Sequence, residues 1–311
     1  MSGDMSYTTE EIAKLLKISK LTVYDLIKKG ELPSYRVGKQ MRVDASDLEA
    51  YKQRSRGFIQ QERTMGTPDH ASAAQLHPPL VITGQDISLD LLAKHIEKQL
   101  PGVRPLRSYV GSLDSLIAMY RGEADIVSTH LLEGDTGEYN LPYIRKLLVG
   151  TSYIVVNLLS RQAGLYVRQG NPHKLKDWSD LARPKLRLVN RERGSGARVL
   201  LDEQLRLHGI RPEQLLGYDT EETNHLGVAG KVASGAADVG VGIEKAASIV
   251  GNVQFIPLIQ ERYDLVMLKR PDNQAWIEAV LRILRSEAWR TELQGIAGYD
   301  ASRTGQIWLE T

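Results

Sequence analysis

Apolar residues recur at helical spacing close to the N-terminus. Ile12, Leu15 and Leu16 form the first stripe. Thr8, followed three residues later by Glu11, has the spacing of a capping box at a helix start. The pattern predicts a helix that begins after Thr8 and ends near Leu16.

A second helical stripe begins only two residues later. Ser19 is placed to cap this helix, and Gly30 is placed to end it. Val23, Leu26 and Ile27 form the inward face. Because the connection is so short, the two helices must cross sharply, as in a helix-turn-helix.

Alternating residues follow the second helix. The segment 32–43 predicts two short strands around a turn at Gly38 and Lys39. Ser46 or Asp44 is then placed to cap a third helix that runs through Tyr51. We therefore expect a winged helix-turn-helix domain over residues 1–54.

Periodicity is lost between Arg54 and Pro79, where polar residues, Ala and Pro predominate, and we interpret residues 55–79 as a linker. Strands and helices alternate after it, and a second cycle begins near Leu186. This rhythm predicts an α/β fold with a mostly parallel sheet and helices on both faces. The first cycle comprises a strand over 80–83, a helix over 89–99, a strand over 107–110, a helix over 113–121 and a strand over 125–129.

An internal repeat organises this second region. Residues 111–127 match residues 224–240 at a constant offset, and Ser112 corresponds to His225. Four further positions are identical in the two copies: Leu113 and Leu226, Gly122 and Gly235, Ala124 and Ala237, Asp125 and Asp238. The repeat predicts two similar lobes that face a cleft. We expect a two-lobed domain over 80–311, with lobe one at 80–160 and 258–311, lobe two at 161–257, and a hinge where the chain crosses near Ser160 and Leu258.

Composition adds few constraints. The 311 residues are 42% hydrophobic and 25% charged, as in ordinary globular domains, with a net charge of +2. Residues 1–56 hold 11 Lys and Arg against 8 Asp and Glu, so the excess positive charge lies on the predicted winged helix-turn-helix domain. The absence of Cys excludes disulfides and thiolate metal sites. With no secretion signal and no long apolar run, we expect a cytoplasmic protein without membrane, metal or cofactor sites.

Four loops between strands and helices carry the candidate ligand chemistry, because helix N-termini present unpaired N–H groups that attract anions. The loop at 193–198 stands out, since Gly194 and Gly196 permit close approach, but it has neither Walker nor dinucleotide-binding spacing. Ligand contact competes here with an ordinary glycine-rich turn. The candidate ligand-binding residues are Thr83, Gln85, Asp86, Ser112, Arg193, Ser195, Arg198, His225 and Tyr263.

Other interpretations of these residues stay open. His225 could be a helix cap or a buried histidine with satisfied hydrogen bonds. Asp125 and Asp238 are interpreted as structural residues at strand starts, because they occupy the same place in each copy. Asp86 and Glu261 could form an acid/base pair, but no nucleophile or metal triad accompanies them. We therefore expect a binding protein and not an enzyme.

The predicted second helix carries polar residues that its core does not need. In a helix-turn-helix, the N-terminal part of the second helix enters the major groove, so Ser19, Lys20 and Thr22 are expected to face bases or phosphates. The remaining candidate DNA contacts lie on the same helix or on the wing, beside the phosphate backbone. They are Tyr24, Lys28, Arg36, Lys39 and Arg42.

Residues 7–52 resemble the MerR-like, excisionase-type winged helix-turn-helix family. The resemblance is carried by Tyr7-Thr8-Thr9-Glu10-Glu11-Ile12-Ala13, by the segment 23–33, and by Arg36-Val37-Gly38-Lys39 with Arg42-Val43 and Asp47-Leu48-Glu49. It implies sequence-directed binding of double-stranded DNA, with the helix over 19–28 in the major groove and the wing around Lys39 beside it.

Residues 80 to about 270 look like the periplasmic-binding-protein-like domain related to molybdate-binding proteins. The carrying segments are 89–93, 121–125, 130–132, 136–140, 170–172, 190–191, 194–196, 222–225 and 261–265. The chain departs from the family where Gly84 stands for serine, Gln85 for histidine and Ala197 for threonine. Molybdate relatives use neutral hydroxyl and N–H donors, so this departure makes another small anion or polar ligand plausible. Restoring the two hydroxyls is expected to raise oxyanion affinity if both positions contact the ligand.

The combined interpretation is a ligand-responsive one-component transcription regulator. It binds operator DNA, senses a small anion, either a molybdate- or tungstate-like oxyanion or a small polar organic molecule, and is expected to act as a homodimer. The alternatives are a solute-binding protein of a transport system, an enzyme on this two-lobed scaffold, and an architectural excisionase.

Overall fold

The structure is a computed structural model that describes residues 6–16, 20–28, 32–37, 40–48, 51 and 79–311. Its contacts divide the chain into two compact units, residues 1–73 and 74–311. The predicted linker falls almost entirely outside the described residues. The two units are therefore described one at a time.

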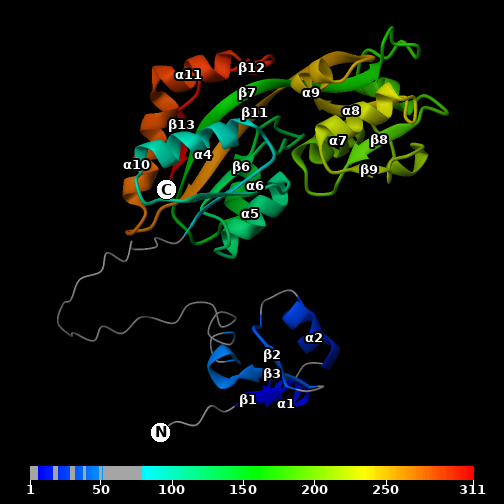
Figure 1. Cartoon of the computed structure of the whole chain (residues 1–311). Helices are drawn as coiled ribbons and strands as arrows, with labels where there is room; N and C mark the ends of the chain where they lie inside the picture. Colours follow the sequence, from blue (N-terminus) through cyan, green and yellow to red (C-terminus); the bar gives the residue numbers. More distant parts are fainter. Residues whose placement is uncertain (1–5, 17–19, 29–31, 38–39, 49–50, 52–78) are drawn as a thin grey trace. The chain divides into compact units, whose positions relative to one another are not determined.

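The N-terminal unit has the predicted helix-turn-helix with an additional strand (Figure 1). Its three strands form an antiparallel sheet in the order β1-β3-β2. The elements are β1 (Ser6–Thr8), α1 (Thr9–Leu16), α2 (Lys20–Lys28), β2 (Tyr35–Val37), β3 (Gln40–Asp44) and a helical segment at residues 45–48 and 51. The strand β1 was not predicted, because three residues are too short to show an alternation.

Packing in this unit follows the apolar pattern. A small core consists of Ile12, Val23, Leu32, Val43 and Leu48, with Leu26 and Ile27 packed against it. The capping box is confirmed, since the Glu11 carboxylate accepts from Thr8 N at 2.8 Å and the Thr8 hydroxyl accepts from Glu11 N at 3.4 Å. The predicted cap Ser19, the stop Gly30 and the turn at Gly38 and Lys39 lie outside the described residues.

The large unit contains one mixed sheet in the order β5-β4-β6-β11-β7-β10-β8-β9, with β12 and β13 also paired to β7. Its strands are β4 (Leu80–Thr83), β5 (Pro105–Ser108), β6 (Ile126–Thr129), β7 (Tyr153–Arg168), β8 (Leu188–Arg191), β9 (Glu221–Glu222), β10 (Val239–Ile243), β11 (Val253–Leu268), β12 (Tyr299–Asp300) and β13 (Ile307–Glu310). Its helices are α4 (Ser88–Gln99), α5 (Ser112–Tyr120), α6 (Leu141–Leu147), α7 (Gly196–Leu207), α8 (His225–Ala233), α9 (Glu244–Ile249), α10 (Gln274–Arg285) and α11 (Glu287–Gln294), with short 3-10 turns at Trp178–Ala182 and Pro212–Gln214.

Two similar halves flank the long strands of this sheet. The first half contains β4, α4, β5, α5, β6 and α6, and the second contains β8, α7, β9, α8, β10 and α9. In each half the parallel strands have the same order, β5-β4-β6 and β9-β8-β10. The helices α5 and α8 begin at Ser112 and His225, as the repeat predicted. The similarity also covers β4-α4 and β8-α7, which the sequence comparison missed.

The antiparallel strands β7 and β11 join the halves, because they pair from Tyr153 opposite Leu268 to Arg168 opposite Val253 (Figure 1). Register shifts occur between Pro257 and Ile259 and between Tyr263 and Asp264. The predicted hinge lies near these positions, and the predicted lobe boundaries stay predictions.

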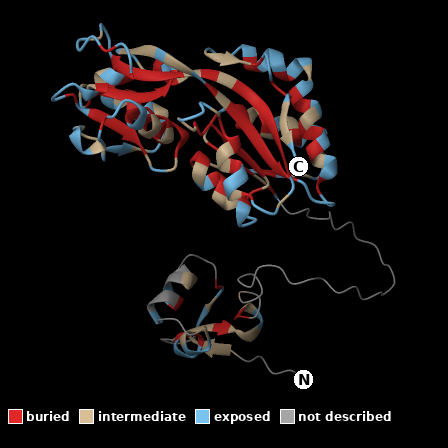
Figure 2. Ribbon diagram, turned by 180° about the vertical axis from the view of Figure 1, so that it is seen from behind, coloured by how far each residue is buried: buried red, intermediate tan, exposed pale blue. Residues whose placement is uncertain are grey.

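Buried residues continue along β7 through both halves, whereas the buried residues of β11 lie in its part from Glu261 to Leu268 (Figure 2). In the first half, α4, α10 and α11 cover one face of the sheet, and α5 and α6 cover the other. In the second half, α7 packs on one side and α8 and α9 on the opposite side. This arrangement directs the first turns of α5, α7 and α8 toward the region between the halves. In the described part of the chain, no helix has the length and apolar content needed to span a bilayer.

Asp125 and Asp238 have the structural role expected from the repeat. The Asp125 carboxylate accepts from Val81 N at 2.8 Å, and the Asp238 carboxylate accepts from Arg187 N at 2.9 Å. Each aspartate thus ties the start of one strand to its neighbour, at equivalent places in the two halves.

Candidate functional site

A cavity of about 250 Å³ lies between the two halves, where the repeat predicted a cleft. Both halves and the strands that join them line it. Its polar lining residues include Gln85, Asp86, Ser112, Ser128, His130, Arg161, Arg191, Ser195, Asn224, His225, Lys245, Tyr263 and Tyr299.

The structure brings together Gln85, Asp86, Ser112, Ser195, His225 and Tyr263 from the sequence-based candidates. Thr83 does not line the cavity; it is buried, and its hydroxyl lies 3.5 Å from the Ile126 carbonyl. Arg193 is 79% exposed and lies 3.9 Å from Asp219. Arg198 is buried beneath the loop, where it contacts Asp202 and Glu221. These three candidates do not line the cavity, because spacing does not show to which side of a loop a side chain turns.

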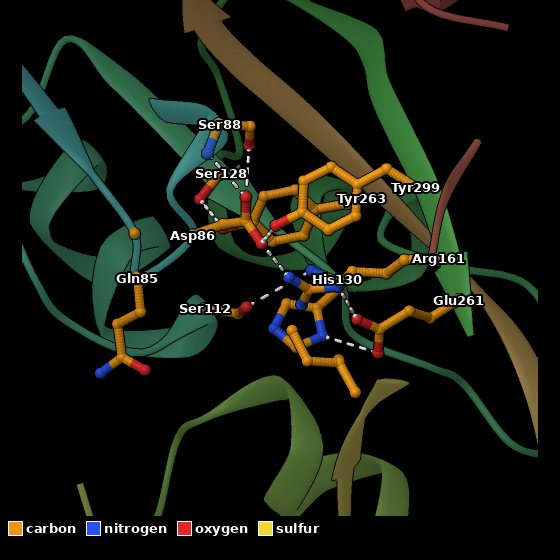
Figure 3. A network of polar contacts seen from close by, with 12 residues as sticks. Gln85, Asp86, Ser88, Ser112, Ser128, His130, Arg161, Glu261, Tyr263 and Tyr299 are labelled. Carbon is orange, nitrogen blue, oxygen red and sulfur yellow. Dashed lines mark hydrogen bonds and ion pairs between the residues drawn. The ribbon is translucent and has the colours of Figure 1, made fainter. Parts of the chain in front are cut away.

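A buried charge network forms one wall of the cavity (Figure 3). The Arg161 guanidinium donates from Nη1 to Asp86 and from Nε to Glu261. The second oxygen of Glu261 lies 3.1 Å from His130 Nδ1. Tyr299 donates to Asp86 at 2.6 Å, and the backbone and hydroxyl of Ser88 donate to its other oxygen at 2.8 and 2.6 Å.

Both carboxylates of this network are held in the ionised form. Burial favours the neutral acid, but Arg161 and His130 outweigh it and lower the pKa of Glu261 to about 2. The same balance between burial and Arg161, with hydrogen bonds from Ser88 and Tyr299, lowers the pKa of Asp86. The Tyr263 ring packs 4.5 Å from the Arg161 guanidinium carbon, and burial raises the pKa of Tyr263 to about 12. All oxygens of Asp86 and Glu261 are thus occupied.

Arg191 forms a second buried cationic site on the other half. Its Nε and Nη2 donate to Glu192 at 2.7 Å, and Nη2 also donates to the side-chain carbonyl of Gln85 across the cavity. No described residue accepts a hydrogen bond from Nη1 of Arg191 or from Nη2 of Arg161. Two fixed guanidinium groups therefore keep one nitrogen each for another partner.

The halves contact each other directly around the cavity. Leu113 N donates to the Gly194 carbonyl at 2.9 Å, and Gln85 Nε2 donates to Glu192 at 3.0 Å. A Cβ on Gly196 would lie 2.4 Å from the His130 ring, so only glycine permits this approach. The glycine at 196 thus serves the contact between the halves; the sequence analysis had expected it to make room for a ligand.

His225 fits neither of its structural interpretations. Asn224 caps α8, because its side chain accepts from Gly227 N at 2.8 Å. The Nδ1 atom of His225 is buried and has no hydrogen-bond partner in the described residues. Burial and the neighbouring Arg191 and Arg161 hold the pKa of His225 well below its usual range, so the ring is neutral. An orphaned polar atom in a cavity wall is a place for a ligand or a water molecule.

Gly84 corrects the interpretation of the missing hydroxyl. Its φ is +132°, and a Cβ there would lie 1.9 Å from the Ser128 hydroxyl and 2.7 Å from Leu89 Cδ1. Ser128 lines the cavity, so its hydroxyl occupies the space that a residue 84 side chain would enter. Ala197 packs in the core beneath α7 and does not line the cavity. The gain in oxyanion affinity was predicted for positions that contact the ligand, a condition that Ala197 does not meet.

Within the described ranges, no cluster of three His, Asp or Glu side chains is placed to hold a metal ion. The polar lining residues absent from the sequence-based candidates are Ser128, His130, Arg161, Arg191, Asn224, Lys245 and Tyr299. Arg161 was detectable as a charge within the apolar run 153–168, and Arg191 as a charge at the end of a strand. Nothing in the sequence distinguished Lys245 or Tyr299, because only the fold brings α9 and β12 to the cavity.

The candidate DNA contacts are partly described. Tyr24 and Arg36 are exposed, and Lys20, 48% exposed, pairs with Glu10 at 2.5 Å. Arg42 is half-buried and donates to the Ser6 hydroxyl at 3.1 Å, which gives it a structural role. Ser19 and Lys39 lie outside the described residues, and the side chains of Thr22 and Lys28 on α2 are not described.

The fold and cavity define a two-lobed domain that follows a helix-turn-helix unit. Residues 93–285 match the model of the PBP superfamily domain, and residues 6–56 match that of a helix-turn-helix domain. The chain belongs to the PBP superfamily and carries an N-terminal helix-turn-helix domain. This is the domain composition of a regulator or binding protein.

One relative matches the chain over its whole length, and two solved structures match about two thirds of it. The chain is 50% identical over 313 residues to uncharacterized protein YvgK of Bacillus subtilis (strain 168), with 100% of both chains covered. The ancestral amino acid-binding protein AncCDT-1 has a TM-score of 0.51 at 18% identity, covering 70% of this chain and 95% of its own. The Synechocystis PCC6803 CcmR regulatory domain in complex with 2-PG has a TM-score of 0.51 at 12% identity, covering 67% and 98%. At these identities the two structures show a shared fold.

Proposed function

We propose that this protein is a one-component transcription regulator in which the N-terminal unit binds operator DNA and the large unit binds a small anion. Such a regulator acts in the cytoplasm, where the chromosome lies. Regulation follows if the ligand has different affinities for the conformations that bind and release DNA.

The observation that carries the ligand proposal is the pair of uncommitted guanidinium nitrogens, Nη2 of Arg161 and Nη1 of Arg191, on two arginines that line the same cavity. Each arginine is fixed by other contacts, so little side-chain entropy is lost when an anion binds. The Ser112 hydroxyl accepts from His130 N at 3.3 Å and keeps its own hydrogen for a ligand oxygen. Inorganic oxyanions, molybdate among them, satisfy these donors.

The same geometry favours binding over catalysis. Asp86 and Glu261 are the carboxylates of the network, and each oxygen already accepts from Arg161, His130, Ser88 or Tyr299. A general base needs an oxygen within reach of the proton that it removes. We therefore propose a receptor site without a catalytic step.

The DNA proposal rests on the helix-turn-helix match and on the exposed Lys20 and Tyr24 of α2. Replacing Lys20, Thr22 and Lys39 together with Ala is expected to weaken operator binding in a gel-shift titration with the full chain. The matched control is Lys14→Ala, an exposed lysine on α1. We expect dimers on a palindromic operator, with half-sites spaced by about one helical turn of DNA.

The test of ligand binding uses phosphate, sulfate and molybdate as probes. At about 100 times its dissociation constant, a bound anion stabilises the folded state by about 2.7 kcal/mol, which a thermal-shift assay detects. Arg191→Gln is expected to abolish the shift but to preserve operator binding. Operator binding that survives the triple variant would remove the DNA proposal, and a shift that survives Arg191→Gln would remove the ligand proposal.

A further inference from the structure

The carboxylates of the charge network in the cavity wall have, within the described part of the chain, no oxygen free to pair with a positively charged ligand. Both oxygens of Asp86 and both oxygens of Glu261 are occupied by protein donors. Ser128 donates to the Thr83 carbonyl at 3.1 Å and accepts from Tyr263. Uncommitted donors remain on Arg161, Arg191 and Ser112. The polar end of the cavity thus offers hydrogen-bond donors, which select an anionic group and disfavour an ammonium group.

The other end of the cavity is apolar and opens to solvent. Ile87, Leu226 and Ile249 line the cavity and yet are 46%, 46% and 61% exposed, so they surround its mouth. Ile87 precedes α4 in the first half, whereas Leu226 on α8 and Ile249 on α9 belong to the second half. Large, partly exposed apolar side chains from both halves therefore line one cavity.

Apolar lining continues from the mouth toward the polar end. Ile243 and Ala246 are buried and line the cavity at the start of α9. The Lys245 ammonium group lies 5.4 Å from the Tyr299 ring centre, beside this strip. A four-oxygen anion has about the size of four water molecules, each of which occupies about 30 Å³ in the liquid. Such an anion at the arginines would leave about half of the 250 Å³ cavity unfilled.

We propose that the ligand is an organic anion with an apolar arm. Its carboxylate, or a similar oxyanion group, binds Arg161 Nη2, Arg191 Nη1 and the Ser112 hydroxyl. Its arm lies along Ile243 and Ala246 and ends among the three side chains of the mouth. This inference rests on the proposed ligand-binding function and narrows the ligand to an amphipathic class.

A series of straight-chain carboxylates tests the proposal. Acetate, butyrate and hexanoate are titrated into the full chain by calorimetry, with phosphate, sulfate and molybdate as inorganic probes. We expect affinity to rise about fourfold for each added methylene, as burial of apolar surface requires. Pentanol and pentylamine have the same five-carbon arm without the anion and are expected to bind at least about tenfold more weakly than hexanoate.

Two leucines of equal exposure provide a matched pair. Leu226→Ser is expected to weaken hexanoate about tenfold and to leave acetate unchanged, because Leu226 contacts only the arm. Leu207→Ser changes a leucine that is 47% exposed at the end of α7 and does not line the cavity, so both affinities are expected to stay the same.

The possible results distinguish an error in the apolar-arm inference from an error in the proposed anion-binding function. Inorganic anions could bind while the affinity of the carboxylates does not change with their chain length. That result would overturn the inference that the ligand has an apolar arm, but it would preserve the proposed anion site. Equal losses for Leu226→Ser and Leu207→Ser would also overturn the arm. If no anion, organic or inorganic, bound the full chain, both the arm and the anion site would be wrong.

Discussion

Arg161 lies at the centre of the charge network in the cavity wall. It is a buried cation between two buried carboxylates, in a strand that is otherwise mostly apolar. Buried ion pairs contribute little net stability, because desolvation offsets much of the Coulomb attraction. A fixed guanidinium with one free nitrogen in a cavity is better explained by ligand recognition.

Glu261 predicts a pH dependence of stability. Its pKa is about 2 in the folded protein, below the 4.5 of an unperturbed glutamate, so the unfolded chain binds the proton more tightly. Its stabilising contribution is therefore complete above about pH 4.5 and is lost as the pH falls toward 2. Glu261→Gln is expected to cost about 3 kcal/mol at pH 7, as a broken buried pair does, and less at pH 3.5.

Urea unfolding of parent and variant at the two pH values measures this difference. Glu97→Gln, at an exposed position on α4, is the control and is expected to match the parent at both. A cost for Glu261→Gln that stays constant with pH would show that the ion pair is not the cause.

The close packing around Gly84 predicts that an added side chain destabilises the fold. Gly84→Ser is expected to destabilise the large unit by about 2 kcal/mol or more, because the new Cβ meets Ser128 and Leu89 and the backbone φ is unfavourable. Combining it with Ser128→Ala removes one of the two close contacts and is expected to recover part of the loss in urea unfolding. A serine tolerated without cost would contradict the close approach at this position.

At the scale of the element, the repeat places equivalent aspartates at the starts of β6 and β10. Asp125→Ala and Asp238→Ala each remove the acceptor of a backbone N–H on the neighbouring segment. Each is expected to lower the free energy of unfolding by about 1–3 kcal/mol without changing anion affinity. Asp272→Ala, in an exposed turn, is the control. A loss of anion binding with unchanged stability would assign these aspartates to the site instead.

At the scale of the whole molecule, a regulator must couple its two binding events. If an anion changes operator affinity by some factor, operator DNA must change anion affinity by the same factor. We expect a factor of about 5–150, the usual range for allosteric coupling. Calorimetric titration of the best anion, with and without saturating operator, measures it. Identical anion affinities in the two titrations, with both ligands bound, would show independent domains.

The amino-acid sequence by itself determined the order of the parts. Local periodicity and the Thr8–Glu11 capping box specify the helices of the N-terminal unit, because these signals act over a few residues. The offset between Ser112 and His225 specified two similar halves with helix starts at one cleft. The short strand β1 and the full extent of the repeat could not be predicted, since neither has a local pattern.

Only the tertiary structure decided which side chains meet in the cavity. Arg161, Arg191 and Tyr299 come from three separate strands or strand ends, and their distances depend on how β7 pairs with β11 and β12. Arg198 and Thr83 have the same local chemistry as the residues that line the cavity. In the fold, however, Arg198 forms ion pairs with Asp202 and Glu221, and Thr83 is buried. A sequence specifies which donors exist, whereas packing decides which of them remain free for a ligand, because every donor that finds a protein partner is lost to the site.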